Sequence, residues 1–364
     1  MNYDDLMRIA IENALKGTGN VSPNPLVGAV IVKNDEIVST GWHRKYGEFH
    51  AEIEAIHNAH NVDLEGSTLV VNLEPCSHEG KQPPCVDVII EKGFAKVIIG
   101  MVDPNPLVSG KSIEMMKEAG IEVVTCVLEN ECRWLNRYFI KHISFGLPYI
   151  TLKSALTLNG CVSTHKGESK WISGMESLKV THKMRAEIDA VAIGRGTAMA
   201  DNPELTVRHV DGRSPMRVLF DTNFSSPLEN KMFKDFHRHK TIVVTGGGKN
   251  NRHKVDVLRV VGVKILNCDL DDKGTININE AVRLLSENFN ISSMLVEGGP
   301  KLIATFIEQE LFDEFHFFIA PSLIGNGINL VGNSYFTQKL KDSLKLKYRS
   351  VARSGDDLHV ICTR

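Results

Sequence analysis

Short apolar runs and helical patterns alternate along the first part of the chain. Apolar residues recur at helical spacing over about residues 4–15, from His50 through the HAEIEAI sequence, near residues 86–92 and over residues 109–119. The runs VGAVIV (27–32), STLVVNL (67–73) and AKVIIG (95–100) have the length and composition of buried strands. The alternation predicts a first α/β domain over residues 1–146.

A second alternating set begins at LPYITLKSAL (147–156). It continues through the runs DAVAIG, MRVLF, TIVVT, VVGVKI, SMLVEGG and DEFHFFIA. The polar segments KDFHRHK and GGGKNNRHK are interpreted as loops between these elements. The pattern therefore predicts a second α/β domain over residues 147–364, without internal repeats.

Composition and charge narrow the class of protein. The 364 residues are 42% hydrophobic, enough to bury the cores of two domains. The opening MNYDDLMRIAIENALKG lacks the basic start and apolar core of a signal peptide, and no run approaches about 18 apolar residues. We therefore expect a cytoplasmic protein without a membrane partner. A net charge of −2 lacks the positive field that nucleic-acid binding requires, so small molecules are the expected ligands.

The segment EPCSHEGKQPPC places Cys76 and Cys85 close together in a chain with only seven cysteines. In the reducing compartment expected for this chain, a disulfide between them is disfavoured. His50 lies upstream at the opening of a predicted helix, and the three residues offer the nitrogen and sulfur donors that zinc prefers. Three protein ligands leave one position for a water molecule, whose pKa zinc lowers to about 7.

Glu52 follows His50 by two residues and could carry the proton of that water to a leaving nitrogen. H-x-E followed by P-C and a further Cys is the signature of zinc deaminases, although eight residues separate the two cysteines in place of the usual two. Taken singly, a His or a free Cys is more often a packing residue. Their combination with Glu52 predicts a catalytic zinc site. The cysteines that lack such spacing are interpreted as packing residues: Cys126, Cys132, Cys161, Cys268 and Cys362.

The segments SPNPLVGAVIV, HAEIEAI and NLEPCSHEGKQPPC together resemble the bifunctional deaminase/reductase family of riboflavin biosynthesis, which has the longer cysteine spacing. The resemblance implies a cytidine-deaminase-like α/β/α fold for the first domain. It also implies that Asn24 contacts the substrate and that His78 and Lys81 lie near its ribose phosphate. A loop lysine can hold a phosphate as a point charge, and a solvated lysine is the alternative.

The sequence LVEGGPKLIATFI suggests an anion site in the second domain, because a strand and two glycines precede a helix that begins at Pro300. Backbone N–H groups at such a helix start can bind a dinucleotide pyrophosphate, and a plain turn between strand and helix is the alternative. The segment GRGTAMAD (194–201) lacks the third glycine of the Rossmann fingerprint, so a standard Rossmann domain is disfavoured.

Four further segments, LKSALTLNG, GESKWISG, RAEIDAVAIGRGTAMADNPELTVR and VEGGPKL, resemble the reductase half of the same family. The resemblance implies a dihydrofolate-reductase-like α/β fold and NADPH as cofactor. The implied NADPH contacts are Ala155, Trp171, Thr197, Asp201, Thr222, Gly298, Gly299 and Pro300. The implied substrate contacts are Ser169, Arg185, Leu205, Arg208 and Glu297. Asn159 departs from the family, in which Asp is frequent at this position.

Side-chain chemistry suggests roles for some of these residues. Arg185 and Arg208 could hold the substrate phosphate through charge-assisted hydrogen bonds, or could instead pair with local carboxylates. Trp171 could cover a flat ring. Lys153 is the candidate catalytic residue for proton transfer during reduction, and Glu297 is the alternative proton donor.

The resemblance implies a two-step enzyme that acts on 2,5-diamino-6-ribosylamino-4(3H)-pyrimidinone 5′-phosphate. The first domain would release the 2-amino group as ammonia, and the second would reduce the ribosyl group to ribityl with NADPH. Two alternatives are a deaminase of a nucleoside or tRNA base fused to an unrelated reductase, and a noncatalytic protein with structural zinc. The near-neutral charge disfavours tRNA, and the missing fourth ligand disfavours structural zinc. We also expect the chain to form a homo-oligomer.

Overall fold

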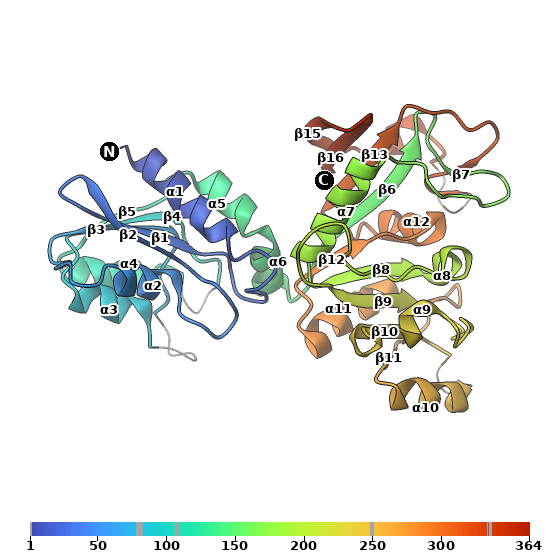
Figure 1. Cartoon of the computed structure of the whole chain (residues 1–364), viewed down its shortest axis with the longest axis horizontal. Helices are drawn as coiled ribbons and strands as arrows, with labels where there is room; N and C mark the ends of the chain where they lie inside the picture. Colours follow the sequence, from blue (N-terminus) through green and yellow to red (C-terminus); the bar gives the residue numbers. More distant parts are fainter. Residues whose placement is uncertain (1, 78–82, 106–108, 248–250, 333, 335–336) are drawn as a thin grey trace. The chain divides into compact units, whose positions relative to one another are not determined.

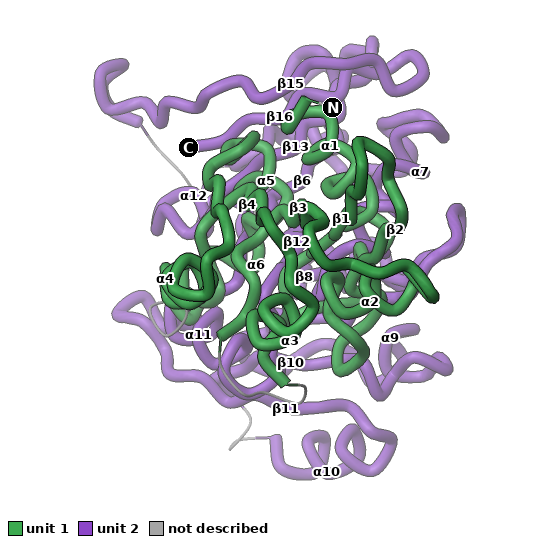
Figure 2. Tube along the Cα trace, turned by 90° about the vertical axis from the view of Figure 1, so that its left-hand side faces the viewer, with its two compact units in different colours: residues 1–147 green, residues 148–364 purple. Residues whose placement is uncertain are grey.

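Each half of the chain is built around its own β-sheet (Figures 1 and 2). The computed structural model describes residues 2–77, 83–105, 109–247, 251–332, 334 and 337–364. Contacts divide the chain into a first unit, residues 1–147, and a second unit, residues 148–364. Both units combine strands with helices, so the α/β class predicted from the alternating pattern is confirmed.

The first unit contains a five-stranded sheet. Its strands are β1 (Gly28–Lys33), β2 (Glu36–Trp42), β3 (Thr68–Leu73), β4 (Lys96–Met101) and β5 (Glu122–Val124). Its helices are α1 (Tyr3–Leu15), α2 (Ala51–Asn58), α3 (Cys85–Glu91), α4 (Lys111–Glu118), α5 (Glu129–Leu135) and α6 (Arg137–Phe145). The strand order is β2-β1-β3-β4-β5, with β1 antiparallel to β2 and β3, and with β3, β4 and β5 parallel.

Helices cover both faces of this sheet. Figure 1 shows α1 and α5 on one side and α2, α3 and α4 on the other. Strands β3 and β4 are therefore buried along almost their whole length, which explains their continuous apolar sequences. Helix α1 begins at a favourable cap, because the Asn2 side chain accepts a hydrogen bond from the Asp4 backbone N–H.

Helix α2 lies very close to strand β2 at Gly41. A Cβ atom at this position would lie 2.3 Å from the backbone nitrogen of Ala55 and 2.5 Å from the backbone oxygen of Ala51. Both distances are far below van der Waals contact, so only glycine lets the helix pack this closely. Because α2 begins directly after His50 and contains Glu52, this contact helps to position the candidate metal site.

The second unit contains a nine-stranded sheet and a small two-stranded one. Its strands are β6 (Tyr149–Thr157), β7 (Cys161–Ser163), β8 (Ala190–Gly194), β9 (Met216–Phe220), β10 (Thr241–Thr245), β11 (Lys264–Asn267), β12 (Ser293–Val296), β13 (Glu314–Ala320), β14 (Ile328–Asn329), β15 (Lys347–Ser354) and β16 (Asp357–Thr363). Its α-helices are α7 (Met175–Glu187), α8 (Arg195–Asp201), α9 (Lys231–Lys234), α10 (Arg252–Val260), α11 (Ile278–Phe289) and α12 (Pro300–Glu308). The large sheet has the order β11-β10-β9-β8-β12-β6-β13-β16-β15, and β14 pairs with β7. In the large sheet, β16 is antiparallel to both its neighbours, and the other pairs are parallel.

Most predicted strands of the second unit are confirmed, but two interpretations were wrong. Strands β10 and β12 are fully buried, as their apolar runs predict. The run VVGVKI is not a strand throughout, because Val260 ends α10, Gly262 turns the chain with φ +91° and β11 begins at Lys264. The segment GGGKNNRHK is not a loop throughout, because α10 begins at Arg252 and buries its apolar side. Residues 248–250 of that segment lie outside the described residues.

We predict that Gly41→Ala destabilises the first unit by about 1–3 kcal/mol, the usual cost of an overpacked contact. The added methyl group would collide with the backbone of α2, which yields less readily than a flexible side chain. Chemical denaturation followed by fluorescence of Trp42 and Trp134 measures the loss. Gly325→Ala is the control, since a Cβ atom there meets nothing within 4 Å. Equal stability of the two variants would contradict the close packing.

Candidate active sites

Three candidate metal ligands come together at the ends of three elements of the first unit. His50 immediately precedes α2, Cys76 follows β3, and Cys85 is the first residue of α3. The His50 Nδ1 atom lies 3.5 Å from the Cys76 Sγ and 3.3 Å from the Cys85 Sγ. The three donor atoms lie within 4.8 Å of one another, and the described residues contain no second such cluster. His78 and Lys81, which belong to the segment between the cysteines, lie outside the described residues.

The spacing and chemistry of these donors fit zinc. Tetrahedral zinc with Zn–S bonds of about 2.3 Å and Zn–N bonds of about 2.1 Å places its nitrogen and sulfur ligands about 3.6 Å apart, close to the observed distances. A hydrogen bond from Cys85, with a further one from His50, lowers the pKa of the Cys76 thiol to about 4. Thiolate is the form that binds metal. The three residues therefore suit a zinc ion with one open coordination position.

Glu52 lies in the first turn of α2 and is 3% exposed. Burial raises the pKa of its carboxyl group, although the neighbouring His50 opposes the shift. A buried carboxyl group holds its proton more readily than an exposed one, and beside a zinc site it can take up and release a proton, as general acid–base catalysis requires.

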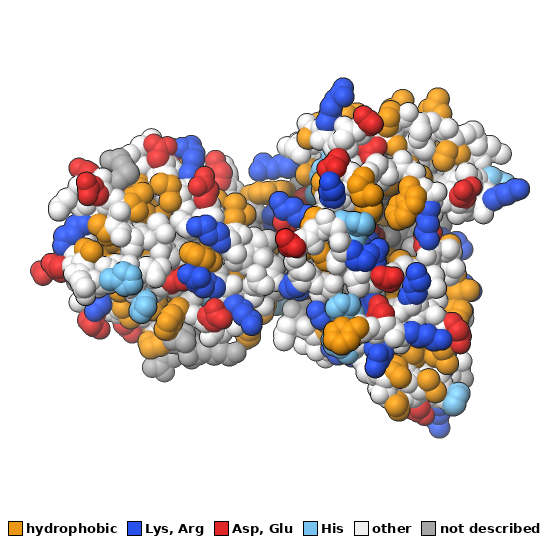
Figure 3. All heavy atoms as spheres, viewed as in Figure 1, with side chains coloured by type: hydrophobic (Ala, Val, Ile, Leu, Met, Phe, Trp, Pro, Cys, Tyr) orange, Lys and Arg blue, Asp and Glu red, His pale blue; other side chains and the backbone are white. Residues whose placement is uncertain are grey.

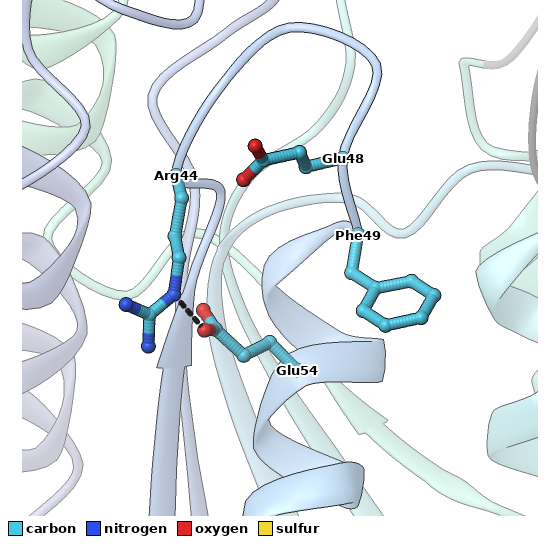
Figure 4. A pocket seen from close by; sticks show the side chains of 4 residues that line it. All are labelled: Arg44, Glu48, Phe49 and Glu54. Carbon is cyan, nitrogen blue, oxygen red and sulfur yellow. Dashed lines mark hydrogen bonds and ion pairs between the residues drawn. The ribbon is translucent and has the colours of Figure 1, made fainter.

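Glu54 is the other acidic residue of the HAEIEAI sequence, and its carboxylate has a different role. It accepts hydrogen bonds from the Trp42 backbone N–H at 2.8 Å and from the Arg44 side chain. Figure 4 shows this ion pair beside Glu48 and Phe49, which line the same pocket of about 400 Å³. Glu54 therefore connects α2 to the end of β2 and the residues that follow it.

His43 was not predicted from the sequence. It is a buried residue that lies beside the metal ligands. It is 2% exposed, and its ring meets the His50 ring edge to face with 5.5 Å between centroids. Its Nδ1 lies 2.9 Å from the Phe49 carbonyl oxygen, and its Nε2 lies 3.2 Å from the Asn24 side-chain nitrogen. Burial lowers the pKa of His43, which favours the neutral ring. The predicted substrate contact Asn24 is thus linked to the zinc site through His43.

Glu74 is a second buried residue that the sequence analysis missed. Its carboxylate accepts hydrogen bonds from the backbone N–H groups of Asp103 and Gly110 and from the Ser112 hydroxyl group. Because Glu74 lies two residues before Cys76, it joins the metal ligand to the segment that follows β4.

The predicted cofactor contacts of the second unit follow three neighbouring parallel strands. Thr222 follows β9, Thr197 lies in the first turn of α8 after β8, and the turn 298–300 follows β12. Since these strands are adjacent and parallel, the loops at their carboxyl ends meet at one edge of the sheet. A Cβ atom at Gly299 would lie 3.1 Å from Thr197 Oγ1, so two of the turns are in contact. Helix α12 begins at Pro300 as predicted, and this edge can bind a dinucleotide pyrophosphate.

Lys153 and Ala155 point to the same face of β6, because side chains two residues apart in a strand share a face. The Lys153 ammonium group lies 5.4 Å from the centroid of the Phe318 ring on neighbouring β13. Burial lowers the pKa of Lys153, and the charge of Glu297 opposes this shift. A lysine with a lowered pKa gives up its proton more readily, as a proton donor must.

Arg185 and Glu297 form a buried ion pair. Arg185 Nε and Nη2 lie 2.5 and 2.9 Å from the two carboxylate oxygens of Glu297, and each side chain is 10% exposed. Burial opposes ionisation of Glu297, but the charge and hydrogen bonds of Arg185 lower the pKa of the carboxyl group below its ordinary value. Of the two partners expected for Arg185, a substrate phosphate or a local carboxylate, the structure shows the carboxylate. Glu297 is ionised in this pair and has no proton to donate at neutral pH.

The segment after α8 has a strained backbone that side chains hold in place. Leu205 is buried with φ +56°, a conformation that costs about 1–3 kcal/mol for a branched side chain. Arg185 donates to the Thr206 carbonyl oxygen at 3.1 Å, and the Arg208 backbone N–H donates to His182 Nδ1 at 3.0 Å. Strain maintained by surrounding contacts is typical of binding sites.

The remaining predicted contacts of the second unit are more exposed. Ser169 donates a hydrogen bond to the Asp201 carboxylate at 3.1 Å, which joins a predicted substrate contact to a predicted cofactor contact. Trp171 is 74% exposed, so its ring is available to cover a bound ligand. Arg208 pairs with Glu204 at 2.7 Å near the surface.

The two sites define a zinc-dependent deaminase unit joined to a dinucleotide-dependent reductase unit. Residues 1–101 match the cytidine and deoxycytidylate deaminase zinc-binding region, and residues 148–360 match the RibD C-terminal domain.

The chain is also similar over nearly its whole length to proteins named riboflavin biosynthesis protein RibD. It is 41% identical to the protein of Bacillus amyloliquefaciens (97% of this chain and 94% of the relative) and 32% identical to that of Escherichia coli K12 (99% and 100%).

Solved structures show the same relationship. The TM-score is 0.88 for RibD of Acinetobacter baumannii, which is 32% identical. It is 0.86 for the diaminohydroxyphosphoribosylaminopyrimidine deaminase/5-amino-6-(5-phosphoribosylamino)uracil reductase of Thermotoga maritima, which is 38% identical. Each comparison covers 99% of this chain and 98% of the other. The chain belongs to the RibD family, the bifunctional deaminase/reductases of riboflavin biosynthesis.

We predict that Glu52→Gln retains zinc but slows deamination by about 10²- to 10⁴-fold, the usual contribution of a positioned acid–base group. The amide preserves the size of the side chain but does not exchange protons, and the metal ligands are unchanged. Zinc content and ammonia release are measured on the same preparation. Glu91→Gln, at an exposed position on α3, is the control. Loss of zinc would show that Glu52 supports the metal, and full activity would exclude it from proton transfer.

Proposed function

We propose that the first unit removes the 2-amino group of 2,5-diamino-6-ribosylamino-4(3H)-pyrimidinone 5′-phosphate as ammonia. The second unit then reduces the ribosyl group with NADPH to give 5-amino-6-ribitylamino-uracil 5′-phosphate. The observation that carries this proposal is the convergence of three zinc ligands, His50, Cys76 and Cys85, next to the buried carboxyl group of Glu52. The name of the Thermotoga maritima protein, a deaminase and a reductase, supports the same pair of reactions.

Deamination combines a metal with a proton carrier. When zinc is bound by the three ligands, it acts as a Lewis acid that makes a water molecule reactive at neutral pH. Glu52 takes a proton from the attacking water and passes it to the leaving amino group, which departs as ammonia. Asn24 hydrogen-bonds the pyrimidine ring. His78 and Lys81 bind the ribose phosphate in this proposal, although they lie outside the described residues.

Reduction needs a hydride and a proton at the ribosyl group. NADPH supplies the hydride to C1′ of the open-chain imine. We assign proton donation to Lys153, because Arg185 keeps Glu297 ionised while burial lowers the pKa of Lys153. The residues proposed to hold the cofactor are Ala155, Trp171, Thr197, Asp201, Thr222, Gly298, Gly299 and Pro300.

The substrate contacts of the reductase divide into two groups by their charge. Arg208 lies near the surface, and a substrate phosphate can replace its exposed partner Glu204. Arg185 is already committed to Glu297, so this pair presents a carboxylate to the polar groups of the substrate. The two uncharged contacts proposed beside them are Ser169 and Leu205.

We also propose that the protein is a cytoplasmic homo-oligomer that binds no nucleic acid. Basic and acidic side chains are interspersed over the face in Figure 3, in keeping with the net charge of −2. Among the described helices, none is long and apolar enough to span a membrane. Strand β15 is the last strand in the order of the large sheet and is exposed except at Ser354, so a second copy can lie against this edge. Light scattering that gives the mass of one chain, 40.4 kDa, would contradict the homo-oligomer.

We predict that Cys85→Ser loses zinc and deamination but still reduces the deaminated substrate. Serine is a poor zinc ligand, and all three ligands lie in the first unit, which has its own core. Zinc stoichiometry, ammonia release and NADPH oxidation are measured on one preparation, with Cys126→Ser at an exposed position as the control. Loss of both activities in a folded variant would contradict two separate sites.

We predict that Arg208→Ala weakens reduction of the phosphorylated substrate by at least about tenfold. The substitution removes the positive charge that is proposed to pair with the substrate phosphate. Deamination should not change. The dephosphorylated substrate should already react slowly and lose little further. Arg259→Ala, which removes a positive charge at an exposed position of helix α10, is the control. If both substrates suffer equally, the phosphate is held elsewhere.

A further inference from the structure

The side-chain amide of Asn24 can present either its oxygen or its nitrogen to a substrate, and neighbouring His43 determines which. His43 Nδ1 lies 2.9 Å from the carbonyl oxygen of Phe49. A carbonyl oxygen can only accept a hydrogen bond, so Nδ1 carries the hydrogen. In the neutral ring, Nε2 is then an acceptor.

The group of Asn24 that faces this acceptor nitrogen must therefore be a hydrogen-bond donor. His43 Nε2 lies 3.2 Å from Asn24 Nδ2, so the amide nitrogen of Asn24 donates to the ring. Asn24 is half-buried, and within the described residues its Oδ1 has no hydrogen-bond partner. The amide oxygen is therefore left for a ligand.

The backbone holds both residues in this arrangement. The His43 N–H donates to the Val27 carbonyl oxygen at 2.9 Å, and the Asn24 N–H donates to the Val21 carbonyl oxygen at 2.9 Å. The His43 ring is 2% exposed and packs edge to face against the ring of His50. The ring therefore has little room to turn over and exchange its two nitrogens.

We propose that His43 is a positioning residue that holds the Asn24 amide with its oxygen toward the substrate, so that Asn24 accepts a hydrogen bond from an N–H group of the pyrimidinone. The inference rests on the proposed role of Asn24 in deamination. If the amide were turned over, its oxygen would face Nε2, and two acceptors would meet without a hydrogen between them. A substrate with an acceptor at the matching ring position would then be favoured over one with an N–H group.

Two substitutions separate this role from simple support of the metal site. His43→Asn can place an amide nitrogen near the former Nδ1 and keep the bond to Phe49, but it is too short to reach Asn24. His43→Gln can place an amide oxygen near the former Nε2 and restore the acceptor for Asn24. We expect kcat/KM for deamination to fall about tenfold in His43→Asn and by less than about threefold in His43→Gln, in line with the loss of one hydrogen bond.

A double-mutant cycle tests whether His43 acts through Asn24. Asn24→Ala should itself lower kcat/KM by about tenfold or more, and the double variant Asn24→Ala/His43→Asn should be no slower than Asn24→Ala. Zinc content and NADPH oxidation with the deaminated substrate are measured for every variant to establish that both units are folded.

Three results would overturn the inference while leaving zinc-dependent deamination in place. They are additive losses in the cycle, a slower His43→Gln than His43→Asn, and loss of zinc from both His43 variants, which would place the effect on His50. Full activity of Asn24→Ala would overturn both the inference and the substrate contact of Asn24. Absence of ammonia release by the unmodified, zinc-loaded chain would instead contradict the proposed function itself.

Discussion

Parallel strands end at the same edge of a sheet, and both active sites depend on this constraint. In the first unit, Cys76 follows β3, and the segment held by Glu74 follows the neighbouring parallel strand β4. In the second unit, the turns proposed to hold the cofactor follow β9, β8 and β12. Residues that are far apart in the sequence thus become neighbours without long loops, and each sheet acts as the rigid support of its site.

Buried charges fix the reductase site within this frame. Arg185 connects Glu297, after β12, to the strained segment after α8. Arg217, which is 1% exposed, contacts the same segment, because it donates a hydrogen bond to the Glu204 carbonyl oxygen at 3.0 Å. Removing one partner of the buried Arg185–Glu297 ion pair would cost roughly 3–5 kcal/mol. Arg208, by contrast, pairs with Glu204 near the surface, where the proposed substrate phosphate could reach it.

Features that depend on short local patterns of residues could be predicted from the sequence. The zinc ligands and Glu52 lie in short motifs whose spacing reflects zinc chemistry, and the buried parallel strands have continuous apolar runs. Contacts between distant residues have no such pattern. Arg185 meets Glu297 across 112 residues, and His43 meets Asn24 across 19 residues, so neither pairing was predicted. Strand β15 was missed because it is almost wholly exposed and therefore shows no apolar alternation.

The central claim is that one chain first deaminates and then reduces the same molecule. The ratio of ammonia released to NADPH oxidised tests it most directly, with the purified, zinc-loaded chain and the diaminopyrimidinone phosphate as the only pyrimidine substrate. The account predicts one ammonia for each NADPH oxidised, with ammonia appearing first. NADPH oxidation without ammonia release, or ammonia release that no NADPH oxidation follows, would contradict it.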